Sequence, residues 1–262
     1  MPPDSRISIS DEVRTYALST QEDLFAELSA STRLEDVGKG RQGAVLAQVD
    51  ATGGVPLVRT TTRYGSPAQR FRAVHERLAR RIREEAGLSV DFNNALVEQY
   101  TNAYTKMGAH SDQALDLADD SFIAVFSCYR HPEESAPRKL IFERKEGQGG
   151  KEGERREIPL DHNGFVVFSV ESNRRLKHKI VLDNPAQRAE NQWLGVTFRT
   201  SKTFVRFRDG QAFLPMGSRL TSADDEQRVE FLGLRRRENR ETDFTYPLLT
   251  YTLSESDLMP PV

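Results

Sequence analysis

The chain has 262 residues, which is enough for one large β domain or two small ones with a sizeable core. Charged residues make up 29% and hydrophobic residues 37%, and no apolar run approaches the ~20 residues that a membrane-spanning helix requires. We therefore expect a soluble globular protein without a membrane partner. The net charge of −2 gives no global field that attracts a phosphate backbone, although a local basic patch could still bind nucleic acid.

The N-terminal stretch MPPDSRISISDEVR is polar and lacks the apolar segment of a signal peptide. The chain has one cysteine, Cys128, which cannot form a disulfide within the chain. Both features predict a cytoplasmic protein, since disulfides are rare in that reducing compartment.

The first ninety residues mix helix and strand signals. Residues 1–18 are expected to form a loose arm or one that pairs at a sheet edge. Ser19 and Glu22 have the spacing of a capping box, which predicts a short helix. Residues 44–49 and 56–62 are rich in β-forming side chains and predict two strands on either side of a Gly-Gly turn.

The clearest helix signal begins at Ser66. Ser66 is the expected N-cap, Pro67 suits the first helical position, and Gly87 is a stop signal. An apolar stripe recurs every three or four residues and is expected to pack on the outside of a sheet. It consists of Phe71, Val74, Leu78 and Ile82. His75 lies on the same helix, and we expect it to be structural or exposed.

From residue 95 onward the pattern is all β. Short runs separated by Asp, Asn, Gly and Pro cover residues 95–100, 121–129, 139–143, 164–170, 177–182, 193–199 and 203–207. The charged, Gly-rich segment 145–157 is expected to be a mobile hairpin loop. Residues 227–251 are expected to add one or two strands around an Arg-rich turn.

These patterns predict a mainly β (α+β) fold in a single domain, residues 1–262. We expect a two-sheet β barrel or jelly roll braced by N-terminal helices. Residues 1–90 would form a support region of helices and strands, residues 91–216 the core, and residues 217–262 the C-terminal strands.

A metal-binding pattern lies in the core region. His110 and Asp112 form an H-x-D motif, and in a strand residues i and i+2 point to the same face. One imidazole and one carboxylate suit a first-row divalent metal, and a second histidine would complete the set found in non-haem Fe(II) oxygenases. The alternative is a loop histidine capped by an aspartate, because so short a motif also arises by chance.

The second histidine is expected at position 178. His131 and His162 lie in polar or turn-like segments. His178 instead heads a β-rich run and shares its face with Ile180 and Leu182. Several strands fit between Asp112 and His178, as they must if opposite strands of a barrel are to meet at one metal. A satisfied core histidine is the alternative.

Arg199 is a candidate for an anion site. In WLGVTFR, Thr197 and Arg199 share a strand face with Trp193 and Gly195. A guanidinium that faces into a barrel is costly unless it meets an anion, and a dicarboxylate co-substrate would provide a bidentate partner. Thr197 is a further candidate for the same site. The alternative is a surface arginine at the strand end.

Four motifs in this order resemble the AlkB-like branch of the Fe(II)/2-oxoglutarate dioxygenases. They are FNNALVEQY, HSD, DHNGFVVFSVESNRRLKHKI and GVTFR, between residues 92 and 199. The resemblance implies a double-stranded β-helix (jelly-roll) core. It also implies that the iron ligands are His110, Asp112 and His178, and that Arg199 and Tyr100 bind 2-oxoglutarate.

Two positions depart from the family pattern. Glu98 stands where the family has an asparagine, and Trp193 stands where it has a second arginine for 2-oxoglutarate. The sequence therefore leaves open which residue holds the distal carboxylate. Arg199 and Ser201 spell R-x-S, which other members of the superfamily use for that carboxylate. Further alternatives are Lys139 and Lys177.

The resemblance implies an oxygenase that uses Fe(II), 2-oxoglutarate and O2. We expect it to hydroxylate, or oxidatively demethylate, a C–H position of a small organic substrate and to release succinate and CO2. One alternative is AlkB-type dealkylation of nucleic-acid bases, which the arginines near residues 199–208 and 235–240 would support. Another is a non-catalytic binding protein on the same fold, although such a protein has no need for the intact H-x-D motif.

Overall fold

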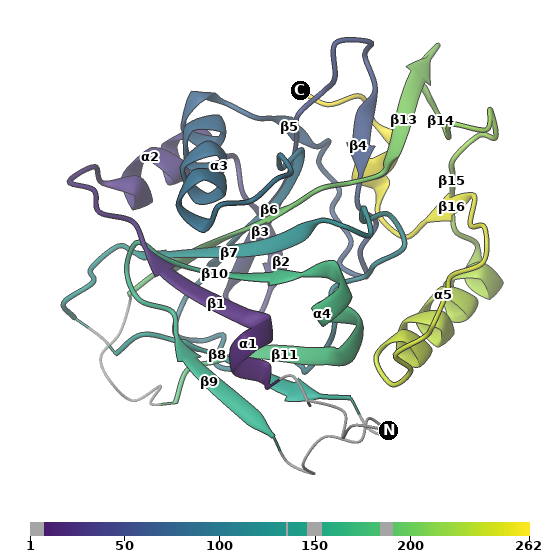
Figure 1. Cartoon of the computed structure of the whole chain (residues 1–262). Helices are drawn as coiled ribbons and strands as arrows, with labels where there is room; N and C mark the ends of the chain where they lie inside the picture. Colours follow the sequence, from purple (N-terminus) through teal and green to yellow (C-terminus); the bar gives the residue numbers. More distant parts are fainter. Residues whose placement is uncertain (1–7, 135, 146–153, 184–190) are drawn as a thin grey trace.

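The computed structural model describes residues 8–134, 136–145, 154–183 and 191–262. Its centre is a large sheet with the strand order β1-β10-β7-β12-β6-β3-β2, in which neighbouring strands run antiparallel (Figure 1). These strands are β1 (Val13–Ala17), β2 (Glu35–Gly38), β3 (Arg41–Ala47), β6 (Asn94–Tyr100), β7 (Phe122–Tyr129), β10 (Gly164–Ser169) and β12 (Trp193–Arg199).

A smaller antiparallel sheet faces the large one. Its strand order is β11-β8-β9, and its strands are β8 (Lys139–Arg144), β9 (Arg155–Pro159) and β11 (Leu176–Val181). Bridges from Lys106 to Val181 and from His110 to His178 add the segment before H-x-D to its edge. Two facing antiparallel sheets form the jelly-roll core that the sequence predicted.

The two faces of the large sheet bury different cores. On β7, Ala124, Phe126 and Cys128 belong to the core on the outer face, whereas Ile123 and Val125 belong to the core between the sheets. This alternation is the period of two that a strand imposes on its side chains. The same alternation along β6 and β12 places their functional residues on the inner face.

Helices α2 (Leu24–Ser31) and α3 (Ala73–Ala86) cover the outer face (Figure 1). The predicted apolar stripe is buried in that core; it consists of Phe71, Val74, Leu78 and Ile82. However, α3 begins at Ala73 and not at Ser66, because Gln69–Arg70 (β5) pairs with the end of β3 as a short parallel strand. The N-cap of α2 is Asp23 and not Ser19, since the Asp23 carboxylate accepts from the main-chain N–H of Ala26 at 3.0 Å.

The N-terminal arm was expected either to be loose or to pair at a sheet edge, and it pairs at a sheet edge. It begins with α1 (Ile9–Glu12), and β1 then pairs with β10. The strand predicted at residues 44–49 is β3. The strand predicted at residues 56–62 is only β4 (Val55–Leu57), because residues 58–62 leave the sheet and line an internal cavity.

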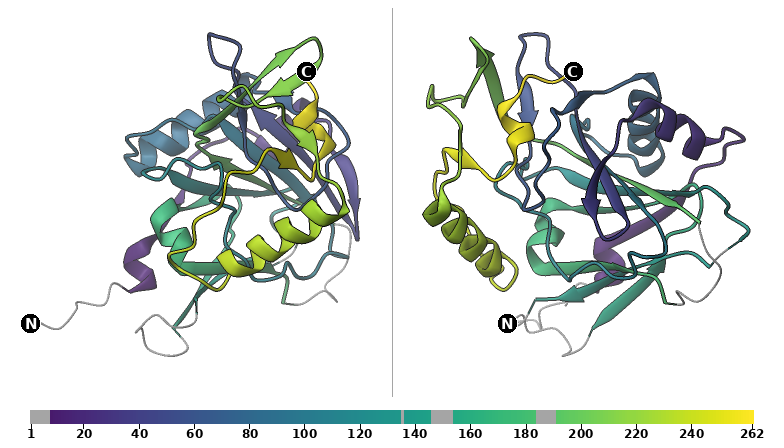
Figure 2. Two further views of the ribbon diagram at one scale, coloured as in Figure 1. Left: turned by 90° about the vertical axis from the view of Figure 1, so that its right-hand side faces the viewer. Right: turned by 180° about the vertical axis from the view of Figure 1, so that it is seen from behind.

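The prediction for the C-terminal region was wrong. Strands were expected at residues 227–251, but α5 (Asp225–Glu238) occupies the first half of that segment. Asp224 and Gln227 cap the helix reciprocally, at 2.8 and 3.1 Å, which favours helix over strand. Figure 2 shows α5 on the side of the molecule opposite α2 and α3.

Short elements complete the C-terminal region and the connections. They are α4 (Val170–Arg175), β13 (Thr203–Arg208), β14 (Gln211–Phe213), β15 (Thr221–Ser222), β16 (Tyr251–Thr252) and the 3-10 helix η1 (Glu255–Leu258). Strand β13 pairs with β4 and β14, and β15 pairs with β16. The division of the chain into one domain with three regions stays a prediction.

Strands β8 and β9 pair antiparallel, so residues 145–154 join a hairpin, as predicted. Residues 155–157, which were expected in the loop, belong instead to β9. The predicted mobility of the loop falls on residues 146–153, which lie outside the described residues. Among the described residues, no helix is both long and apolar enough to span a membrane.

Candidate metal centre

A backbone bridge brings His110 and His178 together. Each donates its main-chain N–H to the carbonyl of the other, at 2.9 and 2.7 Å. Residues that pair in this way across antiparallel segments place their side chains on the same face. The two imidazole centroids are accordingly 4.6 Å apart. His178 lies in β11, as predicted, whereas His110 lies on an isolated bridge rather than in a continuous strand.

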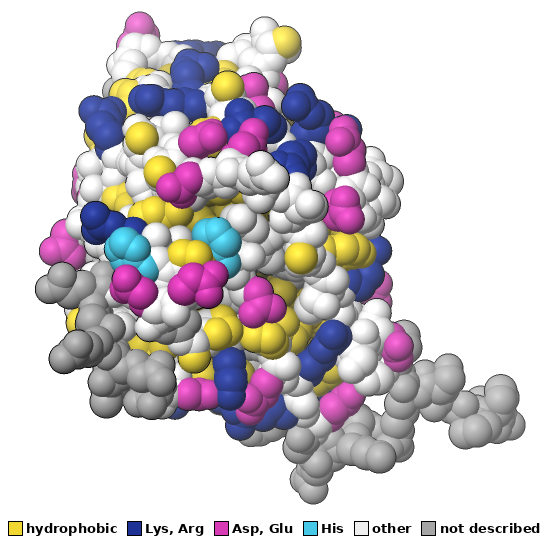
Figure 3. Space-filling model, turned by 90° about the vertical axis from the view of Figure 1, so that its left-hand side faces the viewer, with side chains coloured by type: hydrophobic (Ala, Val, Ile, Leu, Met, Phe, Trp, Pro, Cys, Tyr) yellow, Lys and Arg dark blue, Asp and Glu magenta, His cyan; other side chains and the backbone are white. Residues whose placement is uncertain are grey.

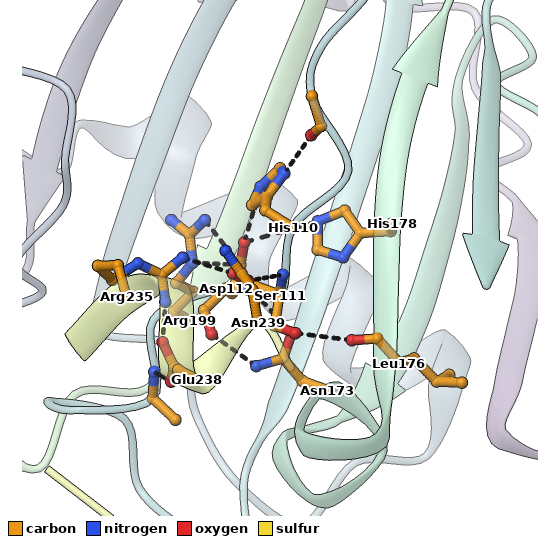
Figure 4. Close-up of polar contacts among 12 residues, drawn as sticks. His110, Ser111, Asp112, Asn173, Leu176, His178, Arg199, Arg235, Glu238 and Asn239 are labelled. Atoms are coloured by element: carbon orange, nitrogen blue, oxygen red, sulfur yellow. Dashed lines mark hydrogen bonds and ion pairs between the residues drawn. The ribbon is translucent and has the colours of Figure 1, made fainter. Parts of the chain in front are cut away.

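Asp112 completes a cluster of three ligand atoms. Its Oδ1 lies 3.7 Å from Nε2 of His110 and 3.6 Å from Nε2 of His178. The candidate ligand atoms of the three residues all lie within 4.8 Å of one another, and Figure 4 shows the side chains converging. Two nitrogens and one carboxylate oxygen at this spacing can hold a divalent first-row metal ion.

The protonation states of the cluster suit metal ligation. Burial lowers the pKa of His178 to about 3 and also lowers the pKa of His110, so both imidazoles are neutral at pH 7. Nδ1 of His110 donates to the main-chain oxygen of Gly108 at 2.9 Å, which leaves the lone pair on Nε2. Burial opposes the ionisation of Asp112, but Arg199 and the two histidines outweigh it and hold the pKa of Asp112 well below its usual value.

Arg199 binds the metal-site carboxylate directly. Its Nε donates to Oδ2 of Asp112 at 2.8 Å, and its Nη2 lies 2.7 Å from the same oxygen. Both residues are buried, with 7% and 6% of their surface exposed. The guanidinium therefore meets an anion, as its inward position predicted, but that anion is a carboxylate of the chain itself.

Asn173 of α4 holds the main chain of Asp112 from the other side. Its Oδ1 accepts from the N–H of Asp112 at 2.8 Å, and its Nδ2 donates to the carbonyl of Asp112 at 2.7 Å. Ser111 donates its hydroxyl to the carbonyl of Leu176 at 2.8 Å. The segment that carries Asp112 is thus fixed against the start of β11, as Figure 4 shows.

The cluster lies in the wall of a cavity of about 270 Å³. One part of the wall is apolar and comes from both sheets; it includes Leu96, Val125, Leu140 and Ile180. Another part is polar and comes from residues 58–62 and from the β3 side of the large sheet; it includes Arg41, Glu98 and Tyr104. The cavity beside the cluster therefore has an apolar part and a polar part in its wall.

Buried groups in the polar wall and behind it have no hydrogen-bond partner among the described residues. Nε of Arg41 lies 3.6 Å from Oε1 of Glu98, beyond hydrogen-bond distance. The Nε of Arg41 and the hydroxyls of Tyr64 and Tyr100 are buried and find no hydrogen-bond partner among the described residues. Burial also raises the pKa of Glu98, since the carboxylate is taken out of water. Buried donors of this kind are costly unless a ligand satisfies them.

The residues predicted to bind the co-substrate separate into two groups. Thr197 and Arg199 line the cavity. Tyr100 and Ser201 are buried beside it and are not part of its lining. The Ser201 hydroxyl donates to the carbonyl of Leu57 and lies 2.9 Å from the carbonyl of Thr203, so its contacts are with the main chain.

Trp193, which stands where the family pattern has an arginine, is held by its neighbours. Its Nε1 donates to Oγ of Ser127 at 2.7 Å, and its ring contacts the ring of Tyr100 with centroids 4.8 Å apart. A Cβ at Gly195 would lie 2.2 Å from the indole, so only glycine gives the ring this position along β12.

Residues before and after the predicted core also line the cavity and could not be identified from the sequence. Arg41 and residues 58–62 carried no signal, because their place depends on the packing of distant segments. Arg235 was expected in an Arg-rich turn between strands, yet it lies in α5, is 8% exposed and lines the cavity. The capping pair at the start of α5 and the helical spacing of Phe231, Arg235 and Glu238 would have indicated a helix with one buried face.

Residues 30–199 match the family model described as the 2OG-Fe(II) oxygenase superfamily. Among solved structures, OsALKBH1 is 15% identical with a TM-score of 0.37, over 64% of this chain and 83% of that chain. A prolyl-4-hydroxylase from Pseudomonas putida is 16% identical with a TM-score of 0.41, over 72% of this chain and 92% of that chain. The search of curated proteins found no match.

The family match covers more than half of the chain and contains all three residues of the metal cluster. It confirms the resemblance to Fe(II)/2-oxoglutarate dioxygenases at the level of the superfamily. The chain therefore belongs to the 2OG-Fe(II) oxygenase superfamily, whose members are oxygenases that use Fe(II), 2-oxoglutarate and O2.

Proposed function

We propose that this oxygenase hydroxylates, or oxidatively demethylates, a C–H position of a small organic substrate. The observation that carries the proposal is the convergence of His110, Asp112 and His178 on one point in the wall of an internal cavity. In this proposal the two neutral imidazoles and Oδ1 of Asp112 hold Fe(II). When bound, the iron with 2-oxoglutarate and O2 supplies the oxidation of a substrate C–H bond, and succinate and CO2 are released.

The chain's own residues would orient the co-substrate. Arg199 uses Nε and Nη2 on Asp112, which leaves Nη1 for a carboxylate of 2-oxoglutarate. Thr197 lies on the same strand face and can donate from its hydroxyl. The hydroxyl of Tyr100, which has no partner among the described residues, is a further donor once a ligand enters or side chains adjust.

The polar wall offers a second cation for the co-substrate. Arg41 lines the cavity, and its Nε is without a hydrogen-bond partner among the described residues. Its guanidinium is held in place by Thr62, which accepts from Nη2 at 3.0 Å, and by the ring of Tyr104. The position at the start of β12 holds Trp193 and not an arginine. Arg41 is therefore our alternative to Arg199 for binding the distal carboxylate of 2-oxoglutarate.

The contacts of the basic residues favour a small molecule over nucleic acid. Lys202 pairs with Asp119 at 3.1 Å, Arg206 donates to the carbonyl of Thr52 at 2.7 Å, and Arg237 pairs with Glu241. On the face that Figure 3 shows, basic and acidic side chains are intermixed. Binding a phosphate backbone requires cations gathered on one surface. AlkB-type dealkylation of nucleic-acid bases remains the alternative function, and the experiment below includes it.

The test measures substrate-dependent succinate release with Fe(II) and 2-oxoglutarate, over a panel of small molecules and of methylated oligonucleotides. We expect turnover with a member of the first set and none with His178→Ala, whose circular dichroism should match the wild type. The exposed His131 gives the matched control, His131→Ala, which should keep full activity. Full activity of His178→Ala would show that His178 is only a core residue, and turnover confined to oligonucleotides would replace the small-molecule proposal.

A further inference from the structure

The segment that carries Asp112 has no regular secondary structure. Residues 111–114 follow the bridge at His110 and belong to no strand or helix, yet they are buried. Buried main-chain N–H and C=O groups need partners, because an unsatisfied one costs about as much as a lost hydrogen bond. In this segment most of the partners are side chains.

Helix α5 and its C-cap residue, Asn239, supply three of those partners. Arg235 donates from Nη2 to the carbonyl of Ser111 at 2.8 Å, and Asn239 accepts from the N–H of Ser111 at 2.8 Å. Glu238 accepts from the N–H of Ala114 at 2.8 Å. Together with Asn173 on the opposite side, they fix the main chain immediately before and after Asp112, as Figure 4 shows.

The supporting side chains are themselves held in place. Arg235 and Glu238 form a buried ion pair, and the second oxygen of Glu238 accepts from the hydroxyl of Tyr246 at 2.6 Å. Lys145, at the end of β8, donates to the main-chain carbonyl of Glu238 at 2.6 Å. Such a network has little freedom to adjust when one member is removed.

We propose that α5 is part of the metal site, and that Arg235, Glu238 and Asn239 are positioning residues for Asp112. They hold the main chain of residues 111–114 so that Oδ1 of Asp112 faces the two imidazoles. The helix lies outside residues 30–199, which match the family model, so this support comes from a part of the chain that the family match does not describe. The inference rests on the proposed metal role of the cluster.

The experiment measures the dissociation constant of Mn(II) by electron paramagnetic resonance of the free ion, together with the melting temperature of the metal-free protein. Mn(II) has ligand preferences close to those of Fe(II) and is stable in air. We expect Arg235→Met and Asn239→Ala to bind Mn(II) at least tenfold more weakly, because partners that orient metal ligands typically contribute factors of 10 to 100.

Conservative variants should restore binding. Arg235→Lys can still donate to the Ser111 carbonyl, and Asn239→Asp keeps the acceptor for the Ser111 N–H, so each should bind Mn(II) more tightly than its partner variant. The neighbouring Arg236 is exposed, and Arg236→Met should leave Mn(II) binding unchanged. Phe231→Leu disturbs the buried face of α5 without touching residues 111–114, and should lower the melting temperature but leave Mn(II) binding unchanged.

The outcomes separate the two proposals. Absence of Mn(II) binding by the wild type, or full binding by His178→Ala, would overturn the proposed metal centre itself. If the wild type binds through His178 and both Arg235→Met and Asn239→Ala bind equally well, only the role of α5 is overturned. If Phe231→Leu weakens Mn(II) binding as much as Arg235→Met does, the role of α5 is also overturned, because the loss of binding would then follow from the lower stability of the protein. If Arg235→Met fails to fold, the comparison of Asn239→Ala with Asn239→Asp decides the question.

Discussion

Both Nε and Nη2 of Arg199 contact the same oxygen of Asp112, Oδ2, at 2.8 and 2.7 Å. Its other oxygen, Oδ1, is the one that faces Nε2 of His110 and Nε2 of His178. Oδ2 of Asp112 therefore pairs with Arg199, while Oδ1 remains free to bind a metal. This arrangement favours a metal bound through Oδ1 alone. The same contact explains how a guanidinium is tolerated inside the barrel, since two of its nitrogens share a negatively charged oxygen.

The first prediction concerns Arg199→Lys. Lysine keeps the charge but loses the planar fork, so its single nitrogen cannot contact Oδ2 of Asp112 from two sides and also place a donor where Nη1 stands. We expect the apparent Michaelis constant for 2-oxoglutarate to rise at least tenfold, which corresponds to ~1.4 kcal/mol. Mn(II) binding should weaken as well, because Asp112 loses part of its support. Titrations of both ligands check the prediction, with Arg206→Lys at an exposed position as the control.

Unchanged affinity for 2-oxoglutarate in Arg199→Lys would mean that another cation anchors the co-substrate. Arg41 is then the residue to change next, since it also lines the cavity.

The second prediction concerns stability below neutral pH. His75 is fully buried; Nδ1 accepts from the main-chain N–H of Arg72 at 3.0 Å, and Nε2 lies 3.1 Å from the hydroxyl of Thr32. Burial lowers the pKa of His75 to about 4, below the ~6.5 of an unfolded chain. The unfolded state therefore binds the proton first, so this contribution to stability is complete above pH 6.5 and is lost as the pH falls toward 4.

Replacing His75 by asparagine removes the titrating group and keeps an acceptor for the N–H of Arg72. We expect the free energy of unfolding to fall less steeply between pH 6.5 and 4.5 in His75→Asn than in the wild type, as measured by urea denaturation. The other acidic and histidine side chains are present in both proteins, so their contributions cancel in the difference. Parallel pH profiles for the two proteins would contradict the assigned role of His75.

The third prediction uses Gly195. An added Cβ would lie 2.2 Å from the indole of Trp193, so Gly195→Ala must displace the ring and break its bond to Ser127. Overpacking of this kind costs roughly 1–3 kcal/mol. Trp193 is the single tryptophan of the chain, so its fluorescence emission reports the displacement directly. Gly233→Ala, in α5 with nothing within 4 Å of the new Cβ, is the control and should stabilise by up to ~1 kcal/mol.

The parts of the fold that the sequence predicted well are those determined by local periodicity. Short β-rich runs indicated the strands β6, β7 and β12, although alternation at residues 95–100 predicted a half-buried strand and β6 is largely buried on both faces. His178 could be placed on its strand because its neighbours Ile180 and Leu182 are aliphatic at every second position. The metal cluster followed from these two facts together with H-x-D. No long-range information was needed beyond the expectation that opposite strands of a barrel meet.

The parts that the sequence predicted poorly depend on tertiary contacts. Ser66 has every local feature of an N-cap, but Gln69 and Arg70 pair with β3, and that sheet contact delays the start of α3. The anion that Arg199 meets could not be identified, because Asp112 is distant in sequence and carried a metal role already. Arg235 was expected in an Arg-rich turn, because the sequence around it is rich in arginine, and only the packing of α5 shows that its side chain is buried.

The last prediction concerns the cavity wall at residues 58–62. Arg59 and Asp116 form a fully buried pair: Nε donates to Oδ2 at 3.0 Å and Nη2 to Oδ1 at 2.9 Å. Nη1 of Arg59 also donates to the carbonyls of Leu249 and Tyr251, at 2.8 and 3.1 Å. Asp116→Asn leaves the buried guanidinium without the carboxylate that pairs with it, and removing one partner of such a pair costs roughly 3–5 kcal/mol.

A double-mutant cycle distinguishes this ion pair from general packing. In an Arg59→Met background there is no guanidinium for Asp116 to pair with, so Asp116→Asn should lower the free energy of unfolding much less than it does in the wild type. The coupling energy between the two positions should be on the order of 1–3 kcal/mol. Asp119 is a matched control, because it is exposed and pairs with Lys202 on the surface, where Asp119→Asn should cost less than ~1 kcal/mol. The free energy of unfolding in urea is the measurement. Additive effects of the two changes would contradict the prediction, because the wall would then be held by packing and by the carbonyl contacts of Arg59 alone.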